Sequence, residues 1–191
     1  MKNIVVFASG SGTNAENIIA HFNKTNSANV VAVFSNNPNA KVLDKAKKWN
    51  VPTVVFTKEA LFSKELLEKL NAFQPDLIVL AGFLLKFPPT IIASYPHKVI
   101  NIHPALLPKY GGKGMYGMNV HQAVIENKET QTGITIHFVN TDYDEGHIIF
   151  QTSVTLIGHE TPEVVAEKVH QLELEHFPGV IENVLNLPNQ Y

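Results

Sequence analysis

The sequence predicts an α/β fold of the Rossmann-like type: a doubly wound, mainly parallel open sheet with a C-terminal antiparallel hairpin and a long C-terminal helix. Two observations predict it. In the first half of the chain, short apolar runs alternate with helix-like segments, which is typical of parallel strands covered on both faces. After residue 103, two strand-like segments follow one another and a long helical segment comes last. Right-handed crossovers make the doubly wound sheet the default arrangement of the first half.

Five apolar runs are expected to form the strands of the first half: Ile4–Ala8, Val30–Phe34, Val54–Phe56, Leu77–Ala81 and Val99–Ile102. Between them, helical spacing of apolar residues predicts three helices, over Asn14–Phe22, Lys41–Trp49 and Lys58–Phe73. In the third helix, leucines at helical intervals are expected to form a buried stripe: Leu61, Leu66, Leu67 and Leu70.

The second half departs from this alternation. Pro104–Met118 holds four glycines and two prolines, too many for a regular element, and is expected to be a loop. A short helix is expected over Asn119–Asn127. Apolar and polar residues alternate over Gly133–Val139, which predicts a half-buried strand, and His147–Leu156 predicts a second strand.

The connection 140–146 is short enough for these two strands to form a hairpin. The last helix is expected to begin after Thr161 as its N-terminal cap, with Pro162 at its first position, and to run to about Leu185. No repeat, linker or low-complexity tract interrupts the chain, so we expect residues 1–191 to form one domain.

Composition excludes several classes of function. The 191 residues are 45% apolar and 17% charged, which is typical of a globular chain. Cysteine is absent, which removes disulfides, zinc–thiolate sites, iron–sulfur clusters and cysteine nucleophiles. The 15 basic residues are all lysine and are outnumbered by 17 acidic ones, so a nucleic-acid groove is not expected. The longest apolar run, Leu77–Leu85, is too short to span a membrane, and no signal-peptide pattern opens the chain. We expect a cytoplasmic protein without nucleic-acid or membrane partners.

The first candidate site is the glycine-rich turn Ser9–Ala15, between a predicted strand and a predicted helix. Its backbone can turn tightly, and the helix N-terminus offers N–H groups and a positive dipole to an anion. A dinucleotide would need an acidic ribose partner near residues 34–37, where the sequence is Phe-Ser-Asn-Asn. The Walker A pattern is also missing. We therefore favour a phosphate monoester, the alternative being a tight turn that binds nothing.

The second candidate is the end of the strand before Pro104. Alternation places Asn101 and His103 on one side of it, and open parallel sheets bind ligands beyond the carboxyl ends of their strands. An amide donor beside a titrating imidazole suits a carbonyl that becomes an oxyanion. The alternative is a capped strand end with a surface histidine.

The third candidate is the acidic connection Asn140–Gly146. Its three acids could bind a hard cation, orient a histidine, or simply form a solvated turn. Its spacing is not that of a calcium loop. Elsewhere, His170 and Glu173 lie one turn apart on the last helix and could share a ligand. No His-Glu-x-x-His motif and no Gly-x-Ser-x-Gly elbow occur, so neither a metal site nor a serine hydrolase is expected.

Taken together, five segments closely resemble the glycinamide ribonucleotide formyltransferase family, whose members use 10-formyltetrahydrofolate in purine biosynthesis. The similarity extends over essentially the whole chain in the same order. It is carried by Phe7–Asn14, Ala81–Phe83, Asn101–Tyr110, His137–Val139 and Asp144–Gly146. The Asn-x-His-Pro and Leu-Leu-Pro motifs with a downstream aspartate mark the wider folate formyltransferases, and the Ser-Gly-x-Gly-Thr-Asn start narrows them to this branch.

The resemblance implies a role for each segment. The catalytic trio would be Asn101, His103 and Asp144. The ribonucleotide would contact Gly12, Thr13, Asn14, His170 and Glu173. The formyl folate would contact Leu84, Leu85, Lys86, Phe87, Asn101, Asn140, Thr141, Asp142, Tyr143 and Asp144. The N-terminal half would thus hold the phosphate and the C-terminal half would complete the folate site, in a monomer or a homodimer without a metal.

The same resemblance implies direct formyl transfer to the substrate amine through a tetrahedral intermediate. We expect the Asp144 carboxylate to raise the pKa of His103 towards the working range. The glycine-rich stretch Tyr110–Met118 is longer than the family's loop and is a candidate lid. The alternatives are a folate-dependent formyltransferase acting on an amino sugar nucleotide, and a non-catalytic module that binds a phosphate ligand.

Overall fold

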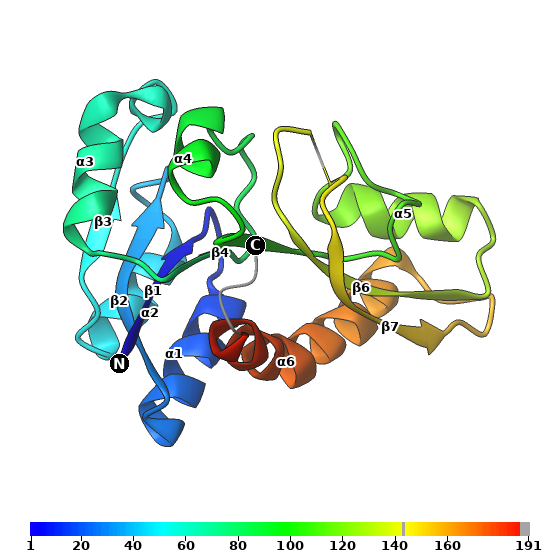
Figure 1. The fold of residues 1–191 in the computed structure, drawn as a ribbon. Coiled ribbons are helices and arrows are strands. Elements are labelled where there is room, and N and C mark those ends of the chain that lie inside the picture. Colours follow the sequence, from blue (N-terminus) through cyan, green and yellow to red (C-terminus); the bar gives the residue numbers. More distant parts are fainter. Residues whose placement is uncertain (143, 188–191) are drawn as a thin grey trace.

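The computed structural model describes residues 1–142 and 144–187, and its centre is a seven-stranded sheet (Figure 1). The strands lie in the order β3-β2-β1-β4-β5-β6-β7. Their bounds are β1 Lys2–Phe7, β2 Ala28–Ser35, β3 Thr53–Val55, β4 Leu77–Leu80, β5 Val99–His103, β6 Gln131–Phe138 and β7 Ile148–Thr155. The helices are α1 Thr13–Thr25, α2 Lys41–Lys48, η1 Ala60–Phe62, α3 Lys64–Ala72, α4 Pro89–Ser94, α5 Met118–Glu126 and α6 Pro162–Asn186.

The strand pairing confirms the predicted doubly wound sheet with its antiparallel hairpin. The first five strands pair in parallel, while β6 runs antiparallel to both β5 and β7. Strand order reverses between β1 and β4, because the chain first winds outward to β3 and then returns to the other side of β1. At such a reversal the loops beyond the strand ends diverge, which leaves room for a ligand.

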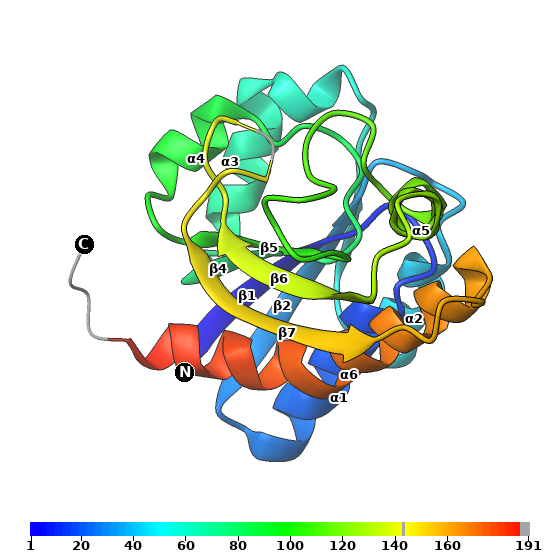
Figure 2. The same cartoon turned by 90° about the vertical axis from the view of Figure 1, so that its right-hand side faces the viewer.

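Helices cover both faces of the sheet, as Figures 1 and 2 show. The helices α1, α2 and α6 pack on one face, where alternate strand residues such as Ile4, Val6 and Ile100 are fully buried. The elements η1, α3 and α4 pack on the other face against residues such as Val5 and Phe7. Burial on both sides explains why the strands are continuously apolar instead of alternating.

The structure corrects one predicted helix of the first half and adds another helix. The segment 58–73 is not one helix, because it turns at Ser63, whose hydroxyl accepts a hydrogen bond from the Leu66 amide and starts a new helix. The short helix α4 was not predicted. It begins with Pro89 at its first position, where a proline ring favours helix initiation.

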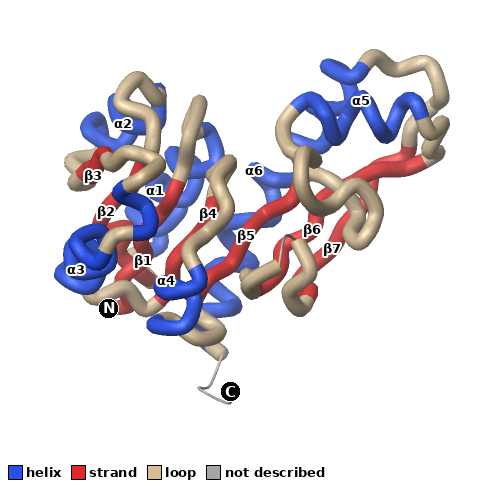
Figure 3. The backbone as a smooth tube through the Cα atoms, turned by 90° about the horizontal axis from the view of Figure 1, so that it is seen from above, coloured by secondary structure: helices blue, strands red, loops and turns tan. Residues whose placement is uncertain are grey.

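The prediction that β6 is half-buried is wrong. Residues 132–137 are buried on both faces, because the chain between β5 and α5 folds over the outer face of the strand. The Thr135 hydroxyl donates to the Ala105 carbonyl at 2.6 Å and accepts from the Leu107 amide at 3.0 Å. Figure 3 shows this loop and α5 at the β6 and β7 end of the sheet.

The long C-terminal helix begins where it was predicted to begin. Thr161 caps α6 by accepting a hydrogen bond from the Val164 amide, and Pro162 is its first residue. The helix lies along one face of the sheet below β6 and β7 (Figure 2), so its middle reaches the α1 side of the site. Within the described residues, no helix combines the length and the apolarity that crossing a bilayer requires.

Candidate active site

A cavity of about 420 Å³ lies beyond the carboxyl ends of β1, β4 and β5. Its walls include every site residue predicted from the sequence except Tyr143, which lies outside the described residues. Five segments that are far apart in the sequence therefore meet at one place. The carboxyl ends of neighbouring parallel strands share one edge of the sheet, which accounts for the proximity of 12–14, 84–87 and 101–103. The β6–β7 connection and the middle of α6 join them only through the tertiary structure.

The glycine-rich turn forms one end of the cavity. Gly12 adopts a left-handed conformation with φ of 71°, and α1 begins immediately after it at Thr13. An added Cβ at Gly12 would run into Val42 of α2, so the turn requires glycine for space as well as for backbone conformation. The N–H groups of the first helical turn have no acceptors within the helix, which makes this end suitable for an anion.

Ser9 and Asn36 form a hydrogen bond beside the glycine-rich turn. The Ser9 hydroxyl donates to Asn36 Oδ1 at 2.6 Å and accepts from the Leu84 amide at 3.1 Å. Asn36 stands where a dinucleotide fold places its acidic ribose partner, and here its side chain is engaged by Ser9. These contacts tie the loops after β1, β2 and β4 together.

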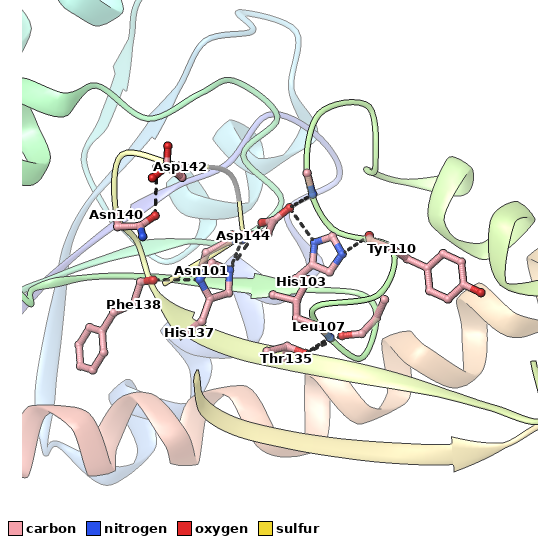
Figure 4. Close-up of polar contacts among 12 residues, drawn as sticks. Asn101, His103, Leu107, Tyr110, Thr135, His137, Phe138, Asn140, Asp142 and Asp144 are labelled. Atoms are coloured by element: carbon pink, nitrogen blue, oxygen red, sulfur yellow. Dashed lines mark hydrogen bonds and ion pairs between the residues drawn. The ribbon is translucent and has the colours of Figure 1, made fainter. Parts of the chain in front are cut away.

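Asn101 projects from β5 beside His137, its partner in the β5–β6 register (Figure 4). His137 Nδ1 lies 2.9 Å from the Phe138 carbonyl oxygen, which can only accept, so this nitrogen carries the hydrogen. In the neutral ring His137 Nε2 is then an acceptor, and it receives the Asn101 amide hydrogen at 3.2 Å. This contact sets the orientation of the Asn101 amide.

His103 and Asp144 face each other in the same close-up. The His103 Nδ1 atom lies 3.6 Å from Asp144 Oδ2, and His137 Nε2 lies 3.6 Å from Asp144 Oδ1. His103 is buried and Asp144 is partly buried, with side-chain exposures of 4% and 13%. The carboxylate thus lies between two imidazole nitrogens, each of which would donate a hydrogen bond to it when its ring is protonated.

The start of the glycine-rich loop contacts both members of this pair. The Tyr110 carbonyl accepts a hydrogen bond from His103 Nε2 at 2.7 Å, and the Gly112 amide donates to Asp144 Oδ2 at 3.0 Å. Gly111 between them lies close to Asp144, and an added Cβ there would be 3.3 Å from the Asp144 Cβ and 2.6 Å from Leu107 Cδ2. A larger residue at Gly111 would require the end of the Leu107 side chain to move and Asp144 to shift by a few tenths of an ångström, so glycine favours this close approach.

The surroundings of His103 correct the expected direction of its pKa shift. Burial lowers the pKa of His103, and the opposing effects of Asp144 and the Tyr110 carbonyl do not overcome it. Asp144 therefore pulls the pKa of His103 upward as predicted, but the net direction is downward. Burial alone would raise the pKa of Asp144, yet His137, His103 and the Gly112 amide outweigh it and hold that pKa below its usual value.

Beside the glycine-rich turn, Glu173 links α6 to Asn14. Its Oε2 atom accepts from Asn14 Nδ2 at 2.8 Å and lies 3.2 Å from His170 Nδ1. The hydrogen bond that His170 donates to the Glu173 carboxylate is the main reason that the pKa of His170 is raised. Asn14 therefore turns its amide nitrogen towards α6, and its Oδ1 atom is buried without a hydrogen-bond partner among the described residues.

Two segments form the third wall. Leu84 to Phe87 follow β4, and Phe87 is buried edge-on against Phe7 with ring centroids 5.1 Å apart, so its ring anchors the segment in the core. Asn140 to Asp142 lie in the β6–β7 connection, where Asn140 Oδ1 accepts from the Asp142 amide at 3.0 Å. This wall therefore combines the apolar side chains of residues 84, 85 and 87 with the polar side chains of residues 140–142.

Two histidines of the site were given no role in the sequence analysis. His137 could have been found from the hairpin, because an antiparallel pairing of β6 with β5 places it opposite Asn101. His121 of α5 lines the cavity and is buried, and burial lowers its pKa. A histidine on a short apolar helix gives no such signal in the sequence. Between residues 1 and 142 and between 144 and 187, no group of three histidine, aspartate or glutamate side chains is arranged to hold a metal ion.

Comparison with known proteins identifies related chains. A family model described as formyl transferase matches residues 2–181. The phosphoribosylglycinamide formyltransferase of Bacillus subtilis is 33% identical over 196 residues, which cover 100% of this chain and 98% of the relative. That of Escherichia coli is 33% identical, with 94% and 85% covered. The chloroplastic enzyme of Arabidopsis thaliana is 36% identical over 95% of this chain, which spans 66% of that relative.

Solved structures give the same result. The phosphoribosylglycinamide formyltransferase of Bacillus halodurans superimposes with a TM-score of 0.88 at 32% identity, and the match covers 100% of this chain and 99% of the other. The glycinamide ribonucleotide transformylase 1 of Geobacillus kaustophilus superimposes with a TM-score of 0.87 at 34% identity, covering 97% and 100%.

Proposed function

This chain belongs to the phosphoribosylglycinamide formyltransferases of the formyl transferase family, and from this premise we propose how its residues carry out the reaction. The enzyme transfers a formyl group from a formyl folate to the amine of phosphoribosylglycinamide in purine biosynthesis. We assign 10-formyltetrahydrofolate as the donor and N1-(5-phospho-β-D-ribosyl)glycinamide as the acceptor, with the N-formyl ribonucleotide and tetrahydrofolate as products. The observation that carries the assignment is the meeting of Asn101, His103 and Asp144 at one cavity wall.

The reaction is a direct acyl transfer. The primary amine of the ribonucleotide attacks the formyl carbon, and the carbonyl electron pair moves onto oxygen to give a tetrahedral intermediate. When that oxygen re-forms its double bond, the bond to the folate nitrogen breaks. The attacking amine has lost one proton by then, and the departing nitrogen gains one. No covalent enzyme intermediate is needed, which agrees with a chain that has no cysteine.

Asn101 and His103 stabilise the developing oxyanion in this mechanism. The Asn101 amide is held by His137 and offers its remaining hydrogen to the cavity. A protonated His103 adds a charged donor, and such preorganised donors usually supply the largest single contribution to acyl transfer. Burial lowers the pKa of His103 in the structure, so the negative charge of the intermediate and of Asp144 must together favour its protonation.

Asp144 stabilises the positive charge that His103 carries during proton transfer. Its carboxylate is ionised, because neighbouring imidazoles and the Gly112 amide lower its pKa. It lies 3.6 Å from His103 Nδ1 and can stabilise the imidazolium while a proton passes between the amine and the folate nitrogen. His103 is the group that exchanges this proton, and Asp144 holds its charge in place.

The two ends of the cavity divide the substrates between them. The backbone of Gly12 and Thr13 at the start of α1 would take the phosphate, while Asn14, His170 and Glu173 would contact the ribosylglycinamide part. The wall made by residues 84–87 and 140–144 would take the folate. This division brings the amine and the formyl group together beside the trio.

A turnover assay tests the proposal. The purified protein is mixed with phosphoribosylglycinamide and 10-formyltetrahydrofolate, and tetrahydrofolate release is followed by absorbance. Turnover that His103→Ala abolishes, with the Kd of the ribonucleotide unchanged, is the expected result. Binding of the ribonucleotide without turnover would leave only the phosphate-binding assignment. Turnover of an amino sugar nucleotide in its place would change the acceptor.

We further propose that residues 1–191 act as one domain in the cytoplasm, as a monomer or a homodimer. The support for one domain is that both substrate subsites and the catalytic trio line a single cavity. Limited proteolysis, cell fractionation and sedimentation would test these three points, and a protease-stable half-chain would contradict the first.

A further inference from the structure

Tyr110 has an unusual backbone for its residue type. It follows Lys109 at the start of the glycine-rich loop, and its φ of 57° lies in the left-handed region that non-glycine residues rarely adopt. Asp144, across the site, also has a left-handed φ of 55°. Such conformations persist only where surrounding contacts enforce them, and they concentrate at functional sites. Both of these residues contact His103.

The left-handed turn at Tyr110 directs its carbonyl at His103. The oxygen accepts from His103 Nε2 at 2.7 Å, and a carbonyl cannot donate, so Nε2 carries a hydrogen in both the neutral and the charged ring. In the neutral ring Nδ1 is therefore the unprotonated nitrogen. It faces Asp144 at 3.6 Å, a gap that leaves it free to gain or lose a proton. The Tyr110 carbonyl thus selects which nitrogen takes part in the reaction.

Contacts at the other end of Tyr110 hold this turn in place. The Tyr110 hydroxyl donates to Glu129 Oε1 at 2.7 Å, and Lys109 Nζ donates to the same oxygen at 2.8 Å. Burial and Glu129 together raise the pKa of Tyr110 to about 12, so the hydroxyl remains a donor at every working pH. The ring also packs against the main apolar cluster of the sheet. Glu129 lies between α5 and β6, and its amide donates to the Val124 carbonyl of α5 at 3.2 Å.

These contacts lie outside the substrate cavity. Tyr110 and Glu129 line a separate hollow of about 260 Å³ with Leu106, Pro108 and Thr132, and neither is among the residues that line the larger cavity. Changing either side chain therefore replaces no residue that lines the substrate cavity. The charged and titratable groups that act on His103 also stay in place, namely Asp144, His137, Glu173 and His121.

We propose that Glu129 and the Tyr110 hydroxyl form a positioning clamp that keeps the Tyr110 carbonyl on His103 Nε2 and reserves Nδ1 for the proton exchanged in formyl transfer. The reaction itself rests on the proposed function. The clamp itself fixes which nitrogen of His103 carries the hydrogen, and this can be measured in the protein without substrate. Tyr110 and Glu129 are positioning residues, since only their effect on His103 reaches the substrates.

Steady-state kinetics test the clamp with matched variants. Tyr110→Phe and Glu129→Leu each remove the hydroxyl–carboxylate bond, and both are expected to lower kcat about three- to tenfold with each KM within twofold. Glu129→Gln keeps an acceptor for the hydroxyl and should restore most of kcat. Tyr95→Phe is the control, because it also removes one hydroxyl bond, to Asn71 Oδ1 at 2.6 Å, on the opposite face of the sheet. It should behave as the wild type.

The pH profile gives a second readout. The Tyr110 carbonyl is one of the groups that raise the pKa of His103. If transfer needs the protonated ring, the rate falls as pH rises through that pKa. In Tyr110→Phe, which loses the clamp, the rate should therefore fall at a lower pH than in the wild type. In Tyr95→Phe, which keeps the clamp, the pH at which the rate falls should be unchanged. Wild-type kcat and pH profile in both Tyr110→Phe and Glu129→Leu would overturn the proposal, as would a rise of KM at constant kcat.

Nitrogen NMR of the histidine rings separates the clamp from the reaction. In the substrate-free protein, neutral His103 should have its hydrogen on Nε2, and Tyr110→Phe should show a mixture of the two tautomers. A wild-type ring with its hydrogen on Nδ1 would refute the clamp, whether or not the protein turns over. The expected tautomer in a protein without turnover would support the clamp and refute the proposed function.

Discussion

Replacement of Asp144 by asparagine tests the central electrostatic argument, because it removes one charge and keeps the shape of the side chain. The oxygen of the new amide would still accept from the Gly112 N–H group, as Asp144 Oδ2 now does at 3.0 Å. What disappears is the attraction between the carboxylate and a protonated His103. The Asp144→Asn enzyme should therefore bind both substrates and transfer the formyl group slowly.

The distance between the two groups sets the size of the effect. At the 3.6 Å that separates His103 Nδ1 from Asp144 Oδ2, Coulomb's law gives about 1 kcal/mol in bulk water and about 5 kcal/mol at an effective dielectric constant of about 20. His103 is buried and Asp144 is partly buried, which favours the upper part of this range. The expected loss in kcat is therefore about 10²- to 10³-fold, at about 1.4 kcal/mol per tenfold.

The assay measures kcat, both KM values and the pH dependence by following folate release. Asp144 is one of the groups that raise the pKa of His103, so its removal should move the alkaline fall of the rate to lower pH. Asp44→Asn, on the exposed surface of α2, is the control for the same chemical change. A kcat within threefold of the wild type, or an unmoved alkaline fall, would refute the pairing of Asp144 with His103.

Three further changes test other parts of the structure. Glu173→Gln removes the charge that holds His170 and Asn14. It should raise the KM for the ribonucleotide about tenfold, while kcat and the KM for the folate stay constant. An unchanged KM for the ribonucleotide would contradict the assigned role of Glu173. Leu70→Ala leaves a cavity at a fully buried position of α3 and should lower the free energy of unfolding in urea by about 2–5 kcal/mol. Its control is Leu187→Ala at an exposed position, which should change that free energy by less than about 0.5 kcal/mol. Equal effects of the two variants would count against the assigned core. Glu160, bonded to Lys168 and to backbone amides, has its pKa lowered to about 2, so its stabilisation is present above the unfolded pKa near 4.5 and is lost as pH falls towards 2. Thermal melts from pH 6 to pH 2 should show a smaller acid-induced drop in Tm for Glu160→Gln than for the wild type, and parallel curves would disprove the linkage.

Local patterns in the sequence were sufficient to predict most elements of the fold. The apolar runs at Ile4–Ala8 and Leu77–Ala81 predicted β1 and β4 to within two residues, because strands buried on both faces must be continuously apolar. Thr161 and Pro162 predicted the start of α6, because capping depends on residues adjacent in the chain. Where the sequence analysis was wrong, the deciding contacts join residues that are far apart in the chain. The burial of β6 on both faces depends on bonds from Thr135 to Ala105 and Leu107.

Residue types and motifs were also enough to indicate which groups could perform the chemistry. The end of a parallel strand predicted Asn101 and His103 as a pair. The family resemblance added Asp144, which reaches them from the connection of the antiparallel β6–β7 hairpin. How these groups act on one another depends on the folded chain. Burial of His103, a sum over neighbours far apart in the chain, reverses the net direction that Asp144 alone would impose on its pKa. The contact between His103 and Tyr110 likewise depends on a left-handed turn that Glu129 holds from 19 residues away. Residue type and spacing thus indicate which side chains can take part in the reaction. Burial and hydrogen bonds between residues far apart in the chain determine which atom of each side chain is free to react.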